Sequence, residues 1–475
     1  MADNPGAGLI ETRSIDWVPH DERHGKLWHQ LPLWFNGNFQ YFSIPIGFIG
    51  PSMGLSLGWT AVAVVVGIVI GTLFMAFHAS QGPHLGLPQM IQSRGQFGYR
   101  GVVIPLAATL FTYVAFNIAD QVLLGSGLKA TFHWNAQVVA VISAVAAALL
   151  AIFGHDWVHR VFRWILAVAL PLMTVVTVGV LLGFGGGATH GHPGAFTWVA
   201  FMAQLSAAAA YNITYAPYVS DYSRYLPVTT RSSGVIASVF GGASIAAIWL
   251  MVLGAWMAIR LGATDGLAGL QTAGDNVVPY LGTIVALLSV LALVATMGMN
   301  AYGGALTVLT IIDSFRSFKP SPRSRVIAVL VLAVVWFAVA ESISGGAVQT
   351  VEVALTLMLY LLVPWTATNL VDFFLVRKGH YAIVEFFKPN GLYGTWAWRG
   401  LVAYAVGFAV EIPFMVLQGL GPVNYVGPAA RALGGVDIAW LVGLAVTSVV
   451  YWLCARSLDL SAEVELEHDE DALLE

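Results

Sequence analysis

Polar residues and helix breakers interrupt an apolar stretch near the start of the chain. The stretch reads LWFNGNFQYFSIPIGFIGP over residues 33–51, and its polar and flexible positions are Asn36, Gly37, Asn38 and Gln40, followed by Pro45. Asn and Gly are poor helix formers, and a proline removes a backbone donor. We expect the helix to unwind here and to expose backbone carbonyls that could bind a cation or a substrate amide. The alternative is that these residues only let helices pack closely.

A second apolar stretch is interrupted in a similar way. It reads FMAQLSAAAAYNITYAPYVSDYSRYLP over residues 201–227 and carries Tyr211, Asn212, Thr214 and Pro217 in sequence. The two interrupted stretches are the first and the sixth apolar spans of the chain. This separation is expected if two five-helix halves repeat with inverted topology, because the broken helices then meet near the membrane midplane and frame a binding site. The repeat is inferred from the breaker positions, since the halves show no clear identity.

The third and eighth spans supply further polar groups. Those of the third span cluster within two turns around an aromatic residue, and the set from both spans is Phe116, Asn117, Asp120, Gln121, Thr296, Asn300 and Tyr302. Phe116 and Asp120 share a helix face because they are four residues apart. An Asn within a span offers a donor and an acceptor to a planar amide or ring nitrogen. Asp120 could instead be a structural partner of a helix end.

Twelve long apolar stretches must position these groups. Of all residues, 58% are hydrophobic and 10% are charged, whereas an ordinary soluble domain has about 25% charged residues. A helix needs roughly 20 apolar residues to cross a bilayer core of about 30 Å. We therefore predict an all-α polytopic membrane protein with spans at 28–53, 57–80, 101–128, 135–154, 161–186, 196–219, 233–260, 277–303, 326–340, 347–369, 398–418 and 436–456.

The basic residues fix the orientation of the spans. If the N-terminus is cytoplasmic, 18 of the 21 Lys and Arg residues fall in inner segments, and only Lys129, Arg260 and Arg431 fall outside. The positive-inside rule requires this bias, so we expect both termini to be cytoplasmic. The expected organisation is a cytoplasmic N-terminal segment (1–27), a first repeat (28–186), a second repeat (196–369), two further spans (398–456) and an acidic cytoplasmic tail (457–475).

Five sequence strings are more specific than hydropathy. They are IETRSIDWVPHDERH at 10–24, QGPHLGLPQMIQSRGQFGYRG at 81–101, DYSRYLP at 221–227, NAYGGALTVLTIID at 300–313 and TNLVDFFLVRKGHY at 368–381. Together they resemble the nucleobase–cation symporter family, which contains purine, cytosine, allantoin and hydantoin permeases. The resemblance extends from about residue 10 to about residue 415.

The resemblance implies a five-plus-five inverted repeat of the leucine-transporter type, followed by two C-terminal helices. It also implies uptake of a planar nitrogen heterocycle by Na⁺ or H⁺ symport with alternating access. In the family, aromatic rings from spans three and six sandwich the heterocycle and amides read its edges. The positions that match are Gln40, Phe116, Gln121, either Tyr211 or Asn212, and Asn300, and the nearby Asn117 and Asp120 complete the expected substrate-binding set.

The coupling ion is left open by the residues that would bind it. In the family, Na⁺ takes carbonyls from the broken first helix and hydroxyls from span eight. Here Asn36 and Phe39 could supply the carbonyls, but Thr296 is the only hydroxyl among residues 290–300. H⁺ coupling is therefore an alternative. We expect no other cofactor and no bound metal, because His190 and His192, one residue apart in an outer loop, are a weak motif.

Four charged residues within the inner strings are expected to have a structural or gating role. They are Arg94, Asp221, Arg224 and Asp313. Such residues can form interfacial salt bridges or helix caps, which would break and reform as the repeats move. We expect this role in preference to substrate contact.

Other classes of protein are less compatible with the chain. An enzyme would need a motif such as HExxH or a Cys-His array, and the sequence has neither and a single cysteine. A formal charge of −4 gives no reason to expect a nucleic-acid partner. A carrier of amino acids or betaines on the same scaffold is the main alternative. The expected partners are a heterocyclic substrate, a coupling cation and the lipid of a bacterial inner membrane, with the protein a monomer.

Overall fold

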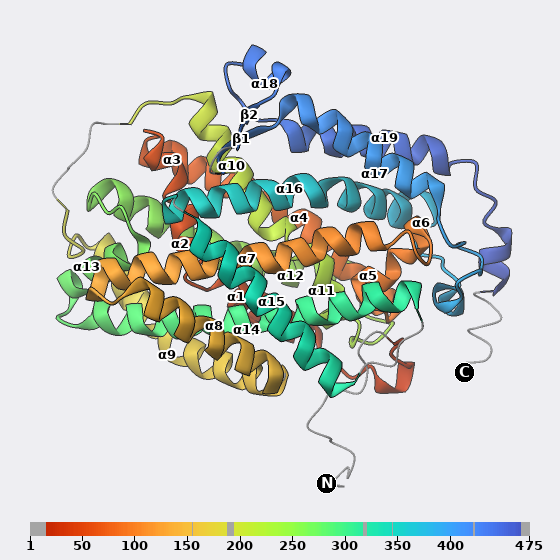
Figure 1. Ribbon diagram of the computed structural model, residues 1–475, viewed down its shortest axis with the longest axis horizontal. Helices are drawn as coiled ribbons and strands as arrows, with labels where there is room; N and C mark the ends of the chain where they lie inside the picture. The colour runs from red at the N-terminus through yellow and green to blue at the C-terminus, as the bar shows by residue number, and fades with distance from the viewer. Residues whose placement is uncertain are drawn as a thin grey trace, which may run out of the picture.

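The computed structural model describes residues 16–153, 155–187, 194–316, 321–343, 345–420 and 423–466. His190, His192 and the last nine residues of the acidic tail lie outside them. Long helices run side by side along the long axis of the molecule, with α13 at one end and α5 and α6 at the other (Figure 1). Seven helices of the described chain are long and apolar enough to cross a membrane.

The first half of the chain has a helical element at each of the first five predicted spans. These elements are α1 (Gln30–Asn38), α2 (Ser43–Ile46), α3 (Ile49–Ser52), α4 (Leu57–Leu85), α5 (Gln89–Gln92), α6 (Arg94–Phe97), α7 (Val103–Phe132), α8 (Ala136–Phe153) and α9 (His155–Leu181). The first span is divided among α1, α2 and α3, which confirms the predicted interruption. Helix α1 ends at Asn38, whose backbone carbonyl accepts a 2.9 Å hydrogen bond from Ser43 Oγ. A side chain thus satisfies a helix-end carbonyl.

The second half is interrupted at its sixth span. Its helices are α10 (Trp198–Ile213), α11 (Ala216–Ser223), α12 (Ser232–Arg260), α13 (Gly266–Val277), α14 (Leu281–Phe315), α15 (Pro322–Ser342) and α16 (Ala347–Val371), which continues as a π-helical turn at Asp372–Val376. Helix α11 restarts at Ala216 with Pro217 in its first turn, where a missing N–H costs nothing. The predicted break is therefore present. Helix α13 was not predicted, and α14 extends twelve residues beyond the predicted end at 303.

The C-terminal part differs from the predicted pair of simple spans. It contains α17 (Trp398–Glu411), β1 (Val416–Leu420), β2 (Val423–Val426), α18 (Pro428–Ala432) and α19 (Ala439–Ala455). The predicted span 398–418 is too long, because α17 ends at Glu411, just before Pro413. The chain then forms an antiparallel hairpin in which Val416 lies opposite Val426. Helices α17 and α19 pack against each other and against α16 (Figure 1).

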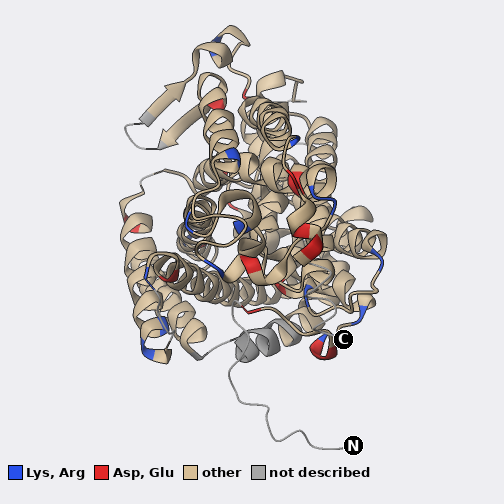
Figure 2. Cartoon of the chain, turned by 90° about the vertical axis from the view of Figure 1, so that its right-hand side faces the viewer, with Lys and Arg blue, Asp and Glu red and all other residues tan. Residues whose placement is uncertain are grey.

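Helices α4, α10 and α12 pack closely because small residues lie between them. A Cβ atom at Gly67 or Gly71 of α4 would lie 2.3 Å and 2.2 Å from the backbone carbonyl oxygens of Leu205 and Ala209 on α10. Small residues allow this backbone approach in membrane helices. Seen nearly end-on, the helices carry few charged positions (Figure 2). We call α1–α3, α4, α10–α11 and α12 the bundle.

One amide side chain holds the broken first span to α10. Gln204 Nε2 donates a 3.1 Å hydrogen bond to the carbonyl of Ile46, and its Oε1 accepts a 2.8 Å bond from the backbone N–H of Gly50. Backbone groups left unpaired at the ends of short helices need such partners where water is excluded. The interruption is therefore a stabilised part of the fold.

Candidate functional site

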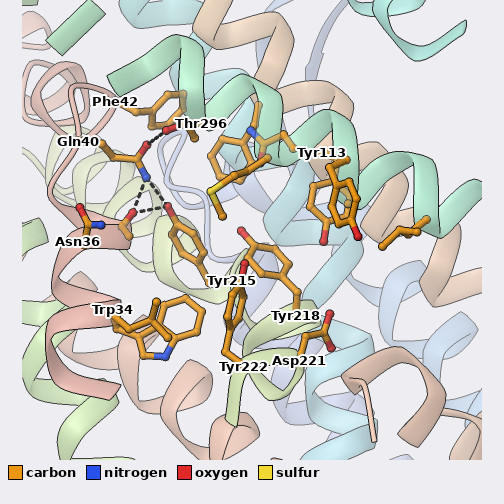
Figure 3. Close-up of a pocket in the computed structure, with 18 of the residues that line it drawn as sticks. Trp34, Asn36, Gln40, Phe42, Tyr113, Tyr215, Tyr218, Asp221, Tyr222 and Thr296 are labelled. Carbon is orange, nitrogen blue, oxygen red and sulfur yellow. Dashed lines mark hydrogen bonds between the residues drawn. The ribbon is translucent and has the colours of Figure 1, made fainter. Parts of the chain in front are cut away.

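A cavity of about 330 Å³ lies between the two interrupted spans, α7 and α14 (Figure 3). Its size is near the lower end of small-molecule sites, which are roughly 300–1,000 Å³. Seven of the predicted substrate-binding and cation-binding residues line it: Asn36, Gln40, Phe116, Asp120, Tyr211, Thr296 and Asn300. The fold thus brings groups from the first, third, sixth and eighth predicted spans to one space.

Gln40 connects three elements at one side of this cavity. Its Oε1 accepts a 2.7 Å hydrogen bond from Thr296 Oγ1 on α14. Its Nε2 donates a 2.8 Å bond to the hydroxyl of Tyr215, at the break between α10 and α11, and a further bond to the carbonyl of Gly37. Figure 3 shows Gln40 between these partners. The amide is therefore held in one orientation, with its polar groups at the cavity wall.

Aromatic rings form the sides of the cavity next to Gln40. The rings of Phe42 and Tyr211 are stacked, with centroids 5.9 Å apart and planes at 12°. The ring of Phe116 lies 5.2 Å from that of Phe42 and 6.4 Å from that of Tyr215. A flat, mostly apolar guest can contact such rings with its faces while its edge meets the amides.

Tyr215 is a cavity residue that the sequence reasoning missed. Its hydroxyl lies 2.9 Å from the carbonyl of Gly37 and 3.3 Å from the hydroxyl of Tyr211. Tyr218 and Tyr222 continue the row along the cavity (Figure 3). The signal was present, because tyrosines at 211, 215, 218 and 222 are spaced three or four residues apart and so share one helix face.

Asp120 lines the cavity, but its carboxylate has no hydrogen-bond partner among the described residues. Its side chain is 1% exposed. A buried carboxylate is ordinarily paired or hydrogen-bonded. This group therefore calls for a functional explanation.

Three other predicted substrate-binding residues do not line the cavity. Asn117 accepts a 3.1 Å bond from Asn300 Nδ2 and donates one of 3.1 Å to the carbonyl of Met297, so it positions α7 against α14. Asn212 Nδ2 donates a 2.6 Å bond to Thr72 Oγ1 on α4, inside the bundle. Gln121 lines a second cavity of about 640 Å³ near the end of α7.

The predicted cation-binding residues do not all face one space. Asn36 and Phe39 line a small space of about 20 Å³ together with Ser289 and Ala292 of α14. Thr296 lines the central cavity instead, where its hydroxyl is bonded to Gln40. Ser289, seven residues before Thr296, also places a hydroxyl group in this small space.

The four predicted gating residues make polar or electrostatic contacts. Asp221 and Arg224 line the cavity; Asp221 Oδ1 accepts a 3.0 Å bond from the backbone N–H of Gln89, and Arg224 donates to Asp16 O at 3.3 Å. Arg94 is 2% exposed and donates to the carbonyl of Phe386 at 3.0 Å. Burial lowers the pKa of Arg94, while its interactions with Tyr99 and Asp313 oppose that shift.

A chain of hydrogen bonds between buried side chains joins the bundle to α16 on this side. Its links are Ser220–Gln89 at 2.6 Å, Gln89–Gln81 at 3.0 Å, Gln81–Asn369 at 2.8 Å, Asn369–Gln96 at 3.3 Å and Gln96–Asp372 at 2.7 Å. Asp372 forms a 2.5 Å ion pair with Arg377, which also pairs with Glu463 at 2.7 Å. Many polar contacts thus hold α5, α6 and α16 against the bundle.

Comparison with known proteins identifies the class. Residues 17–443 match the family described as permeases for cytosine/purines, uracil, thiamine and allantoin. YxlA of Bacillus subtilis, which carries a provisional purine-cytosine permease name, is 35% identical over 94% of this chain and 96% of its own length. The purine-cytosine permease fcyB of Emericella nidulans is 24% identical over 95% of this chain and 89% of its own. The chain belongs to this permease family; it is a multi-pass membrane transporter and not an enzyme.

Solved structures show the fold that the chain shares. Mhp1, a nucleobase-cation-symport-1 family transporter solved in a closed conformation with bromovinylhydantoin bound, has a TM-score of 0.71 at 18% identity over 97% of this chain and 100% of its own. Its inward-facing conformation has a TM-score of 0.70 at 17% identity, covering 97% and 98%. The family match over residues 17–443 and the identity with YxlA confirm the family predicted from the five sequence strings.

Proposed function

We propose that this permease imports a nucleobase or a related planar nitrogen heterocycle, of the purine, cytosine, allantoin or hydantoin type, together with a cation. The observation that carries the proposal is the cavity between two interrupted helices, with rings on its sides and amides at its wall. The names of YxlA and fcyB and the hydantoin ligand of Mhp1 support the same substrate class.

The chemistry of the cavity fits such a guest. A nucleobase has two π faces and a rim of donors and acceptors, and stacking on an aromatic ring is worth about 1–3 kcal/mol per base. Phe116 and Tyr215 offer ring faces, while Asn36, Asp120 and Asn300 offer polar groups to the rim. Discrimination then comes from wrong ligands that leave buried polar groups unpaired.

Transport would follow from movement of the bundle against the remaining helices. We infer twelve spans, of which 28–186 and 196–369 form two inverted five-span halves and 398–456 adds two more. Both termini would be cytoplasmic in a bacterial inner membrane, and the carrier would work as a monomer. Because Asp221 and Arg224 line its end, the cavity would open toward the cytoplasm. The coupling ion is Na⁺ or H⁺, and no other cofactor is needed.

Uptake by the purified protein in proteoliposomes tests this proposal. Labelled adenine, guanine, cytosine, uracil, allantoin and hydantoin are offered under a Na⁺ gradient or a pH gradient, with empty liposomes as the control. We expect gradient-dependent accumulation of at least one of them, and competition by its unlabelled form but not by leucine or glycine betaine. Absence of uptake and of counterflow for all six would refute the proposal.

A further inference from the structure

Asp120 stands apart from the other polar groups of the central cavity. Gln40, Thr296 and Asn300 each have a hydrogen-bond partner, but the two oxygens of Asp120 have none among the described residues. The side chain is 1% exposed and lines the cavity. The structure therefore holds an acid in the space where a substrate would bind, with its hydrogen-bonding capacity unused.

Asp120 forms neither a hydrogen bond nor an ion pair with any described residue. The titratable groups that interact with it electrostatically are the hydroxyls of Tyr211 and Tyr215. Helix α8 has no charged residue between Ala136 and Ile152. The titratable groups of the other helices packed against α7 are Asp275 of α13, with Asp265 at its start, Tyr302 and Asp313 of α14, Arg323, Arg325 and Glu341 of α15, and Glu352 and Tyr360 of α16. Arg224, the basic residue of the cavity wall, lies at its inner end.

A buried carboxylate without a partner is energetically unfavourable. Even after relaxation, burial of one ion costs several kcal/mol. A group in this position avoids that cost by binding a proton. Asp120 is then a neutral acid whenever the cavity is closed and contains no partner for a negative charge.

We propose that Asp120 carries the co-transported proton and that its neutral form reads a donor–acceptor edge of the heterocycle. The proposal rests on the proposed function and specifies its ion. A neutral carboxyl group presents an O–H donor beside a C=O acceptor, whereas a carboxylate only accepts. A ring nitrogen beside an exocyclic amino group, or a ring N–H beside a carbonyl, complements the neutral acid with two hydrogen bonds.

Release follows when the cavity opens to the cytoplasm. The O–H bond of Asp120 breaks, the proton passes to water, and the electron pair stays on the carboxylate; no bond of the substrate changes. The carboxylate then repels the acceptor atom of the substrate edge, so proton and substrate leave together.

Asp120→Asn tests the proposal, because an amide keeps the donor and the acceptor but cannot release a proton. We expect this variant to bind cytosine or adenine within about threefold of the wild type, to lose the pH dependence of binding, and to retain counterflow exchange. Accumulation driven by a pH gradient should fall at least tenfold. Asp120→Ala should weaken binding at every pH, and Glu352→Gln, outside the cavity, should behave as the wild type.

A measurement on the wild type tests the same proposal independently if Asp120→Asn does not fold. Calorimetry in buffers of different ionisation enthalpy should show proton uptake on substrate binding that increases with pH. The inference is overturned if wild-type binding takes up no proton, or if Asp120→Asn accumulates substrate under a pH gradient as well as the wild type. In both cases wild-type counterflow would persist. Loss of counterflow itself would instead refute the proposed function.

Discussion

The hydroxyl of Thr296 on α14 donates a 2.7 Å hydrogen bond to Oε1 of Gln40, which follows the end of α1. This contact crosses the cavity wall and joins the interrupted first span to a helix outside the bundle. Because Gln40 also binds Tyr215 at 2.8 Å, the amide connects both interrupted spans to α14. One side chain thus links both interrupted spans to α14 on this side of the site.

The contact between Gln40 and Thr296 should appear as energetic coupling. A net hydrogen bond is worth about 0.5–1.5 kcal/mol, and residues in contact show non-additive effects. We expect a coupling of about 1 kcal/mol between Gln40→Ala and Thr296→Val in the unfolding free energy measured in detergent. Thr272 is exposed, and Thr272→Val combined with Gln40→Ala is the control. The effects of these two substitutions on the unfolding free energy should add. Additivity at Thr296 would contradict the contact.

Phe116→Ala should lower substrate affinity without unfolding the protein. Stacking on an aromatic ring contributes about 1–3 kcal/mol, and each 1.4 kcal/mol is about tenfold in affinity. The expected loss is therefore about 5-fold to 150-fold in competition binding, with most of the affinity restored in Phe116→Trp. Phe77→Ala, on the outer face of α4, should bind as the wild type. An unchanged affinity in Phe116→Ala would show that this ring does not contact the substrate.

Asn212→Ala should affect stability more than binding. Asn212 donates to Thr72 inside the bundle and is fully buried, so its removal costs a hydrogen bond, about 1 kcal/mol. We expect a lower thermal midpoint and a nucleobase affinity within about twofold of the wild type. Tyr211→Ala, which removes a cavity ring, should show the larger loss of affinity. The opposite ranking would place Asn212 rather than Tyr211 in contact with the substrate.

Gly71→Ala should destabilise the bundle although alanine favours helices. The added Cβ would lie 2.2 Å from the carbonyl oxygen of Ala209, so α4 and α10 must separate. Overpacking of this kind costs about 1–3 kcal/mol, which exceeds the helix-propensity gain of about 1 kcal/mol. Gly58→Ala on the same helix meets nothing within 4 Å and is the control. A thermal midpoint at or above that of Gly58→Ala would contradict the close packing.

Arg377→Met should be strongly destabilising. The guanidinium is 5% exposed and pairs with Asp372 and Glu463, so its loss leaves two carboxylates without their cation. Breaking a buried ion pair from one side costs about 3–5 kcal/mol. Chemical denaturation should show that the free energy of unfolding falls by this amount. Arg431 is exposed, so Arg431→Met should change stability little. Equal stabilities would mean that the network contributes little to the fold.

The helix interruptions could be predicted from sequence because they have local causes. Asn36, Gly37 and Asn38 lower helix propensity, and Pro217 restarts a helix at its first turn. The same kind of reasoning failed after Glu411, where apolar residues continue past Pro413 but form a hairpin instead of a helix. Hydropathy measures the preference for lipid and does not distinguish a helix from a short sheet at the membrane surface.

The site was predicted less completely than the fold, because helix rotation is not fixed by composition. Adjacent residues on a helix point about 100° apart, so Asp120 and Gln121 could both be proposed although only Asp120 lines the central cavity. Tyr215 was missed because it lies just after the break. Asn212 was included as an alternative to Tyr211, and only the packing of α10 on α4 places its amide inside the bundle.

The division between Asp120 and Gln121 has an electrical consequence. These neighbours on α7 face two separate cavities, so the carboxyl group of Asp120 and the amide of Gln121 are not exposed to the same space. A charge that crosses the whole membrane gains about 2.3 kcal/mol for every 100 mV. If Asp120 carries a proton across with a neutral heterocycle, each turnover moves one charge and should register as current.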